Sequence, residues 1–258
     1  MKIVFDLDYT LLDTAKFKEA LAAAVTAQGV SRGRYEETYQ AVVKREGKVY
    51  DYDPEAHLAA LKADLPDAAA ADEARRGIAA VLADTEKYLY PGAVELLQEL
   101  RANGAGLALM TLGNEKWQRA KVEHSGLAAM FDEVLATEKK KAAAIRELGR
   151  DGGKIIVVND NGEEMKEMMA VAPEYRYFLK RGPKAVPEDL KLPEGRDIGE
   201  LAALLAAETG WEIDLERGRE KGIEISEARR TGSVRSGRPR PESGAAESAA
   251  PMGPEKRL

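Results

Sequence analysis

The sequence predicts an α/β protein in which a parallel sheet is covered by helices and a separate group of helices follows the first strand. Two observations indicate this fold. Apolar runs of strand length alternate with helical patterns from Tyr90 to Thr209, which is typical of a parallel sheet with helices on both faces. Residues 15–88 instead carry helical patterns alone, rich in Ala, Leu, Glu and Lys.

The first strand is expected over Lys2–Leu7, where a nearly continuous apolar run indicates burial on both faces. The helical segment that follows has apolar residues at spacings of three and four. Turn signals divide it into four or five predicted helices, and these signals are Gly29, Gly47, Pro54 and Pro66.

Strands and helices alternate after the helical segment. A helix starts at Pro91 and ends at Asn103–Gly104, as Pro at the start and Gly at the end of a helix favour. The later predicted strands are Gly106–Met110, Glu133–Ala136, Lys154–Val158 and Tyr175–Leu179. The later predicted helices are Glu115–Ser125, Lys139–Leu148, Glu163–Val171 and Asp197–Thr209.

This pattern divides the chain into a core over 1–14 and 89–210, a helical insertion over 15–88 and an extension of uncertain structure over 211–226. From Glu227 to Leu258 large apolar residues are almost absent, so this tail is expected to be disordered. Its arginines could contact nucleic acid or an acidic partner, but a solvated tail is the favoured interpretation.

Composition excludes several classes of site. The chain of 258 residues has no cysteine, which excludes a disulfide framework, a thiolate zinc site and a cysteine nucleophile. Its net charge of −6 does not favour nucleic acid or anionic membranes. The first apolar run is broken by Asp6, and no stretch approaches the ~20 apolar residues that span a bilayer. We therefore expect a cytoplasmic protein without a membrane partner.

Polar side chains gather where the predicted strands end. In an open parallel sheet, ligands bind beyond the carboxyl ends of the strands. The residues at these positions are Asp6, Asp8, Thr10, Thr111, Asn114, Lys139, Lys140, Lys141, Asp160 and Glu164. Acids, a hydroxyl and a cation together indicate chemistry on an anionic substrate.

Hydrolysis of a phosphate monoester would use each of these groups. An Asp carboxylate can form an aspartyl-phosphate, and Mg²⁺ accepts carboxylate oxygens such as those of Asp6 and Asp160. One Lys would balance the remaining negative charge. In an extended strand residues i and i+2 lie on the same side, so Asp8 could protonate the leaving alcohol and then activate water.

These residues resemble those of the haloacid dehalogenase-like hydrolase superfamily, in the right order over roughly 1–205. The first family motif, DxDx[TV], is matched by Asp6, Asp8 and Thr10, and the second by Thr111 after an apolar strand. The third, a Lys before a helix, lies among 139–141. The fourth, an acid after a strand with another acid beyond it, is matched by Asp160 and Glu164.

The resemblance implies a Rossmann-like core, a C1 cap formed by the insertion, and a Mg²⁺-dependent phosphatase for a small phosphorylated metabolite. It implies that Asp6 is the nucleophile and Asp8 the acid and base. It implies that the phosphate is bound by Thr111, Leu112 and Lys141. The Mg²⁺ ligands would be Asp6, Asp8 and Asp160, and Thr10 and Glu164 would support these residues from behind. Lys141 is preferred because it precedes Ile145 by four residues, but Lys139 and Lys140 stay open.

Other functions are less favoured. A dehalogenase releases no alcohol, so it has no use for Asp8. A phosphonatase is less favoured because it needs a cap lysine that forms a Schiff base, although Lys16, Lys44 and Lys48 leave it formally open. A phosphomutase with the same acids and a non-catalytic binding protein stay open as alternatives. The sequence does not predict the oligomeric state or name the phosphate ester.

Several aromatic and histidine side chains are given structural roles. His57 and His124 lie in helical stretches away from the strand ends, so neither is expected to be catalytic. Trp117 is expected in the core or at a rim. The loop 50–53 could contact substrate, although a plain connection between helices is favoured.

Overall fold

The computed structural model describes residues 1–44, 52–150 and 152–219. Residues 1–222 form one compact unit. The tail predicted from residue 227 onward lies outside the described residues. Within the described ranges, none of the helices is both long and apolar enough to cross a bilayer.

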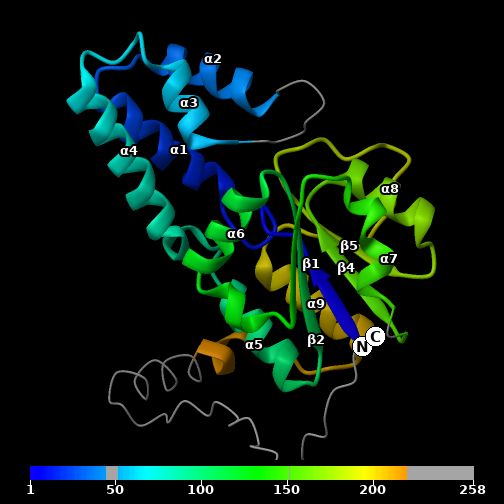
Figure 1. Ribbon diagram of the computed structural model, residues 1–258. Coiled ribbons are helices and arrows are strands. Elements are labelled where there is room, and N and C mark those ends of the chain that lie inside the picture. Colours follow the sequence, from blue (N-terminus) through cyan, green and yellow to red (C-terminus); the bar gives the residue numbers. More distant parts are fainter. Residues whose placement is uncertain (45–51, 151, 220–258) are drawn as a thin grey trace, which may run out of the picture. The chain divides into compact units, whose positions relative to one another are not determined.

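The core of this unit is a six-stranded sheet in the order β3-β2-β1-β4-β5-β6 (Figure 1). Every pair of neighbouring strands is parallel, which confirms the predicted parallel sheet. The strands are β1 (Lys2–Phe5), β2 (Gly106–Leu112), β3 (Glu133–Thr137), β4 (Ile155–Asn159), β5 (Arg176–Lys180) and β6 (Glu194–Gly195).

Helices cover both faces of the sheet because successive strand residues point to opposite sides. On one face, Ile3 and Phe5 join a buried cluster that includes residues of α5 (Ala93–Ala102), α6 (Glu115–His124) and α9 (Ile198–Thr209). On the other, Val4 packs in a second cluster with α7 (Ile145–Leu148) and α8 (Gly162–Val171). β1 is therefore buried on both faces, as its apolar run predicts.

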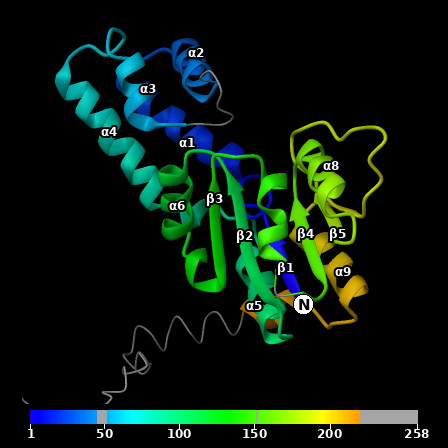
Figure 2. The same cartoon turned by 45° about the vertical axis from the view of Figure 1, so that its right-hand side comes forward.

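The helical insertion consists of four α-helices and a short 3₁₀ helix in its described part. Figures 1 and 2 show the four α-helices grouped beyond the arrowheads of β1 and β2. These elements are α1 (Thr14–Thr26), α2 (Arg32–Val43), α3 (Pro54–Ala60), α4 (Ala68–Ala83) and η1 (Thr85–Tyr88). The prediction of a helical bundle after the first strand is confirmed, and its action as a separate cap stays a proposal.

The chain enters and leaves the helical insertion at adjacent points. Leu12 and Leu89 form an isolated antiparallel bridge. The amide of Asp13 donates to the carbonyl of Tyr88 at 2.7 Å, and the amide of Tyr90 donates to that of Leu11 at 2.9 Å. The two connecting segments therefore hold each other at the edge of the sheet where β1 ends.

The helix predicted over Lys139–Leu148 is wrong. The structure has two short pieces there, η3 (Lys141–Ala143) and α7, separated at Ala144. Lys140 is extended, with φ −50° and ψ 135°. A continuous helix would fix the direction of Lys141, whereas the break lets its buried ammonium group reach Asp6.

The first strand also ends earlier than predicted, at Phe5 rather than Leu7. The carbonyl of Leu7 accepts hydrogen bonds from the amides of residues 10, 11 and 12, so the chain turns tightly there. Tyr9 lies in this turn with φ +61°, a conformation that residues other than glycine rarely adopt. The DxD motif therefore spans the end of the strand and the start of this turn, with Asp8 next to the strained Tyr9.

Other boundaries agree with the prediction to within two residues. The helix expected from Pro91 begins at Ala93, because Gly92 at φ +86° forms its N-cap. β6, with two residues, was not predicted, since so short a strand has no periodic pattern. Beyond α9, Leu215 packs against the core, and Arg217 pairs with the fully buried Glu99 at 2.6 Å.

Candidate active site

Three adjacent strands end at one place. β1 lies between β2 and β4 in the sheet, so the residues after β1 lie beside Thr111 at the end of β2 and Asp160 just after β4. The amide of Asp6 continues the pairing with β4 by donating to Val158. Asp6, Asp160 and Lys141, which are far apart in the sequence, line one cavity of about 260 Å³.

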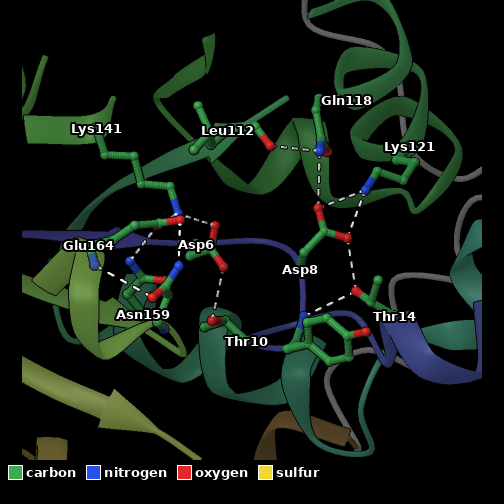
Figure 3. A network of polar contacts seen from close by, with 12 residues as sticks. Asp6, Asp8, Thr10, Thr14, Leu112, Gln118, Lys121, Lys141, Asn159 and Glu164 are labelled. Atoms are coloured by element: carbon green, nitrogen blue, oxygen red, sulfur yellow. Dashed lines mark hydrogen bonds and ion pairs between the residues drawn. The ribbon is translucent and has the colours of Figure 1, made fainter. Parts of the chain in front are cut away.

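Asp6 is 5% exposed and is held from two sides (Figure 3). The ammonium group of Lys141 donates to Asp6 Oδ1 at 2.6 Å, and the hydroxyl of Thr10 donates to Oδ2 at 3.2 Å. Lys141 also pairs with Glu164 at 2.8 Å. One buried lysine thus neutralises part of the charge of two acids.

The environment of Asp6 disfavours its negative charge. Burial raises the pKa of Asp6 to about 6, with Lys141 opposing the rise and Glu164 adding to it. Burial, together with the charge of Asp6, raises the pKa of Asp160 to about 7. Burial alone would raise the pKa of Glu164 too, but Lys141 keeps it below its ordinary value.

Asp8 has the opposite environment. Lys121 of α6 donates to both carboxylate oxygens at 2.7 Å. The hydroxyl of Thr14 donates to Oδ1 at 2.8 Å, and the side-chain amide of Gln118 donates to Oδ2 at 3.1 Å. Burial would raise the pKa of Asp8, yet the Lys121 charge and these hydrogen bonds lower it to about 2. Asp8 is thus held as a carboxylate.

Three buried polar atoms at this place lack a hydrogen-bond partner within the described chain: Thr111 Oγ1, Gln118 Oε1 and Asp160 Oδ2. Buried polar groups are nearly always hydrogen-bonded. Gln118 and Asp160 line the cavity, and Thr111 ends the strand beside Asp6. The unsatisfied atoms indicate a site built for a polar ligand.

The oxygen atoms suit a hard cation. Asp6 and Asp160 offer carboxylate oxygens, and Asp160 Oδ2 is free of protein partners. Over the described ranges, three or more His, Cys, Asp or Glu side chains are nowhere grouped to hold a metal by themselves. Mg²⁺ is commonly bound by one or two carboxylates, with water and substrate phosphate as further ligands. Of the expected ligands, Asp160 fits because its Oδ2 has no partner among the described residues, and Asp6 fits because each of its oxygens accepts a single hydrogen bond and keeps a lone pair for a cation. Each oxygen of Asp8 already accepts two hydrogen bonds.

Comparison with known proteins gives the family. Residues 3–171 match the family model of the haloacid dehalogenase-like hydrolases. The chain belongs to this family. Comparison of this hydrolase with curated proteins finds no match, so the family model and the solved structures carry the comparison.

Three solved structures share the fold of the hydrolase. One, provisionally named a haloacid dehalogenase-like hydrolase, from Burkholderia xenovorans LB400, is 20% identical with a TM-score of 0.64, and covers 80% of this chain and 96% of its own. A second is the HAD-hydrolase YfnB from Bacillus subtilis, also provisionally named and bound to magnesium. It is 18% identical with a TM-score of 0.56, and the match covers 79% of this chain and 97% of YfnB. The third is the L-2-haloacid dehalogenase from Xanthobacter autotrophicus. It is 17% identical with a TM-score of 0.51, and the match covers 79% of this chain and 97% of the dehalogenase.

The structure brings the expected residues of the hydrolase together. Of the three candidate lysines, Lys141 is buried beside Asp6, whereas Lys140 is exposed and pairs with Glu167. Lys139 is exposed as well. Leu112 lines the cavity, and its carbonyl accepts a hydrogen bond from Gln118. The catalytic and binding roles of these residues stay proposals.

Residues that the sequence did not single out complete the site. Gln118 and Lys121 reach Asp8 from α6, while Lys18 and Tyr39 line the cavity from the helical insertion. Their signal is weak, because each is a polar or amphipathic residue on an amphipathic helix and looks like part of a solvated face. Trp117, expected in the core or at a rim, is 8% exposed and lines the cavity as well.

The two histidines lie apart from the cavity, as predicted. His57 is fully buried, and its ring nitrogens contact the hydroxyls of Thr38 at 3.0 Å and Tyr52 at 3.2 Å. His124 is exposed at the end of α6. Tyr52 lines the cavity, so the described end of the loop 50–53 is more than a plain connection; residues 50 and 51 lie outside the described ranges.

Proposed function

We propose that this hydrolase is a Mg²⁺-dependent phosphatase that cleaves a small phosphorylated metabolite through an aspartyl-phosphate on Asp6. The observation that carries the proposal is the pairing of two carboxylates in one cavity, each with its own lysine. Asp6 offers a nucleophile beside a cation, and Asp8 offers a second carboxylate for proton transfer. The helical insertion would act as the cap over the substrate.

Charge balance in the cavity supports a phosphate ligand. Four carboxyl groups line it, from Asp6, Asp8, Asp160 and Glu164, and so do four ammonium groups, from Lys18, Lys121, Lys141 and Lys184. A divalent cation and a phosphate dianion would enter together without changing the net charge. When bound, Mg²⁺ would neutralise the phosphoryl oxygens and reduce their repulsion of the nucleophile.

In the first half-reaction, an Asp6 oxygen attacks phosphorus as the bond from phosphorus to the leaving oxygen breaks. Lys141 and the free hydroxyl of Thr111 offer donors to the phosphoryl oxygens. The leaving oxygen takes a proton from Asp8. In the second half-reaction, Asp8 takes a proton from water, which attacks the phospho-aspartate and releases inorganic phosphate.

The low pKa of Asp8 suits its second role directly, because a base must be ionised. The first role needs a proton on Asp8. An incoming phosphate dianion supplies one reason for protonation, since a nearby negative charge raises the pKa of a carboxyl. It also competes with Asp8 for Lys121, which lines the same cavity.

The test is hydrolysis of p-nitrophenyl phosphate, sugar phosphates, nucleotides and phosphoglycolate with and without Mg²⁺. Asp6→Asn should lower turnover at least about 1,000-fold, because the nucleophile is lost. Asp13→Asn is the matched control: Asp13 lies just beyond the same strand and caps α1, and Asn caps helices equally well. Metal-independent turnover, or none on any ester, would show that the proposal is wrong.

Two alternative activities, that of a dehalogenase and that of a phosphomutase, are checked in parallel. A structural relative is a haloacid dehalogenase, so chloride release from 2-chloropropionate is measured on the same samples. A halide leaves without a proton, and Asp8 with its hydrogen-bond donors would then have no task. A phosphomutase would return isomerised sugar phosphate, with little inorganic phosphate.

A further inference from the structure

Lys18 is a cation of the cavity that the proposed phosphatase chemistry does not use. It lies on α1 four residues after Thr14, so the two side chains share one face of the helix. Thr14 holds Asp8, and Lys18 lines the same cavity, half-buried. Burial lowers the pKa of Lys18, which means that its charge is poorly solvated there.

Lys18 forms no ion pair or hydrogen bond with any residue of the described chain. Its contacts are with two rings, because its ammonium group lies 5.6 Å from the ring centres of both Tyr9 and Tyr39. Lys121 and Lys141 are instead paired with Asp8 and Asp6. A partly buried, unpaired cation facing a cavity is costly unless it binds an anion.

The side of the cavity that carries Lys18 is aromatic. The ring centres of Tyr39 and Tyr52 are 5.1 Å apart, and those of Tyr52 and Trp117 are also 5.1 Å apart. The Tyr52 hydroxyl contacts His57, which fixes one ring from behind. Neighbouring rings are inclined by 35° and 68°, so together they form an apolar wall that suits an apolar body. The cavity of about 260 Å³ is slightly smaller than typical sites for drug-sized ligands.

We propose that the leaving group of the substrate carries a second anionic group, which pairs with Lys18, on an apolar body that lies against Tyr39, Tyr52 and Trp117. This inference rests on the proposed phosphatase function, which places the phosphoryl group at Asp6. The second anion is a carboxylate or a second phosphate. Either would pair with an ammonium group, and the rings would exclude water from that pair.

Binding of non-hydrolysable phosphonates tests the inference without turnover. Calorimetry in the presence of Mg²⁺ compares benzylphosphonate with 4-carboxybenzylphosphonate and with 1,4-xylylenebisphosphonate. The wild-type protein should bind at least one of the two doubly anionic ligands about tenfold more tightly than benzylphosphonate, the gain expected from one charged hydrogen bond. The better of the two shows whether the second anion is a carboxylate or a phosphate.

Substitutions assign the preference to Lys18. Lys18→Met should bring the ratio of affinities close to one, and Lys18→Arg should keep most of it. Lys16→Met is the matched control, because Lys16 lies on the same helix, is exposed and pairs with Asp13. It should keep the full ratio.

Each result decides one of the two proposals. Equal wild-type affinities for all three ligands overturn the inference whatever the variants do, and so does a preference that Lys18→Met retains. If Lys18→Met loses the preference for a doubly anionic ligand and the wild-type protein hydrolyses no ester, the second-anion site is upheld and the phosphatase is rejected. Ester hydrolysis that depends on Asp6, without any Lys18 effect on the ratio, does the reverse.

Discussion

Asp6 and Asp8 are separated by one residue, yet the two sides of the cavity treat them in opposite ways. On the Asp6 side, burial raises the pKa of Asp6 to about 6, because Lys141, which serves two acids, only partly opposes the rise, and the charges of Glu164 and Asp8 add to it. On the Asp8 side, Lys121 serves one acid with help from Thr14 and Gln118, and the pKa falls to about 2.

Burial acts to raise the pKa of both carboxyls, so the difference between them comes from the cations, acids and hydrogen-bond donors around each one. The Asp6 side has too few positive charges for its acids, as a site that awaits a cation should have. On the Asp8 side, both carboxylate oxygens already accept hydrogen bonds from the protein. The same amino acid can therefore serve as a nucleophile in one place and as an acid and base in the other.

The largest expected effect comes from the Asp8 side. Asp8→Asn should lower turnover about 100- to 10,000-fold, the range for loss of a general acid or base, while Asp6 can still attack the phosphorus of the substrate. Steady-state phosphate release and intact-protein mass spectrometry measure the two steps. A phosphorylated protein that accumulates would support the base role in the second step. A rate equal to that of the wild type would contradict any role for Asp8 in proton transfer.

The next effect is on the stability of the Asp6 side. Lys141→Met should lower the free energy of unfolding at pH 7 by about 3 kcal/mol, because Asp6 and Glu164 lose their buried cation. Without it their folded pKa values lie above those of the unfolded chain, so the deficit is largest at pH 7 and should shrink as the pH falls towards about 4 and the acids become neutral. Urea unfolding from pH 4 to pH 7 measures this change.

Lys140→Met is the control for this substitution, since Lys140 is exposed and its pair with Glu167 lies at the surface. It should change the free energy of unfolding by less than about 1 kcal/mol. Equal losses in the two variants would mean that burial of Lys141 next to Asp6 contributes nothing.

The smallest effect concerns the Asp8 side, and its change with pH lies in a more acidic range. The folded pKa of Asp8 lies below the unfolded value of 3.8, so its ionisation stabilises the fold above pH 3.8, and this contribution is lost as the pH falls towards 2. Lys121→Met should remove roughly 2 kcal/mol at pH 7, from about 1.4 kcal/mol per pKa unit. Its difference from the wild type should narrow towards pH 2.

Arg119→Met tests whether any cation on α6 would act in the same way. Arg119 is exposed and pairs with Glu115 on its own helix, so unfolding experiments should find it close to the wild type. A gap between the wild type and Lys121→Met that stays constant from pH 7 to acid would contradict a pKa origin and indicate a packing defect.

Much of the fold and half of the site could be predicted from the sequence. Strands such as β1 and β4 are apolar runs whose burial follows from composition, and Asp6, Thr111 and Asp160 come directly after such runs. Lys121 and Lys18 could not be found in this way. Each lies on a helix, and whether its polar face meets water or Asp8 depends on how that helix packs against a distant part of the chain. The break at Ala144 before α7 could not be found either, because no Gly or Pro marks it in the sequence.

The bridge between Leu12 and Leu89 also bears on how the chain folds. β1 and β2 pair side by side, although the whole helical insertion separates them in the sequence, and closing a long flexible loop costs more conformational entropy than closing a short one. Once the insertion has folded and its two ends are joined, the loop that must close between β1 and β2 consists only of the short segments on either side of the bridge. The insertion can then change in length or sequence with little effect on the rate at which β1 finds β2.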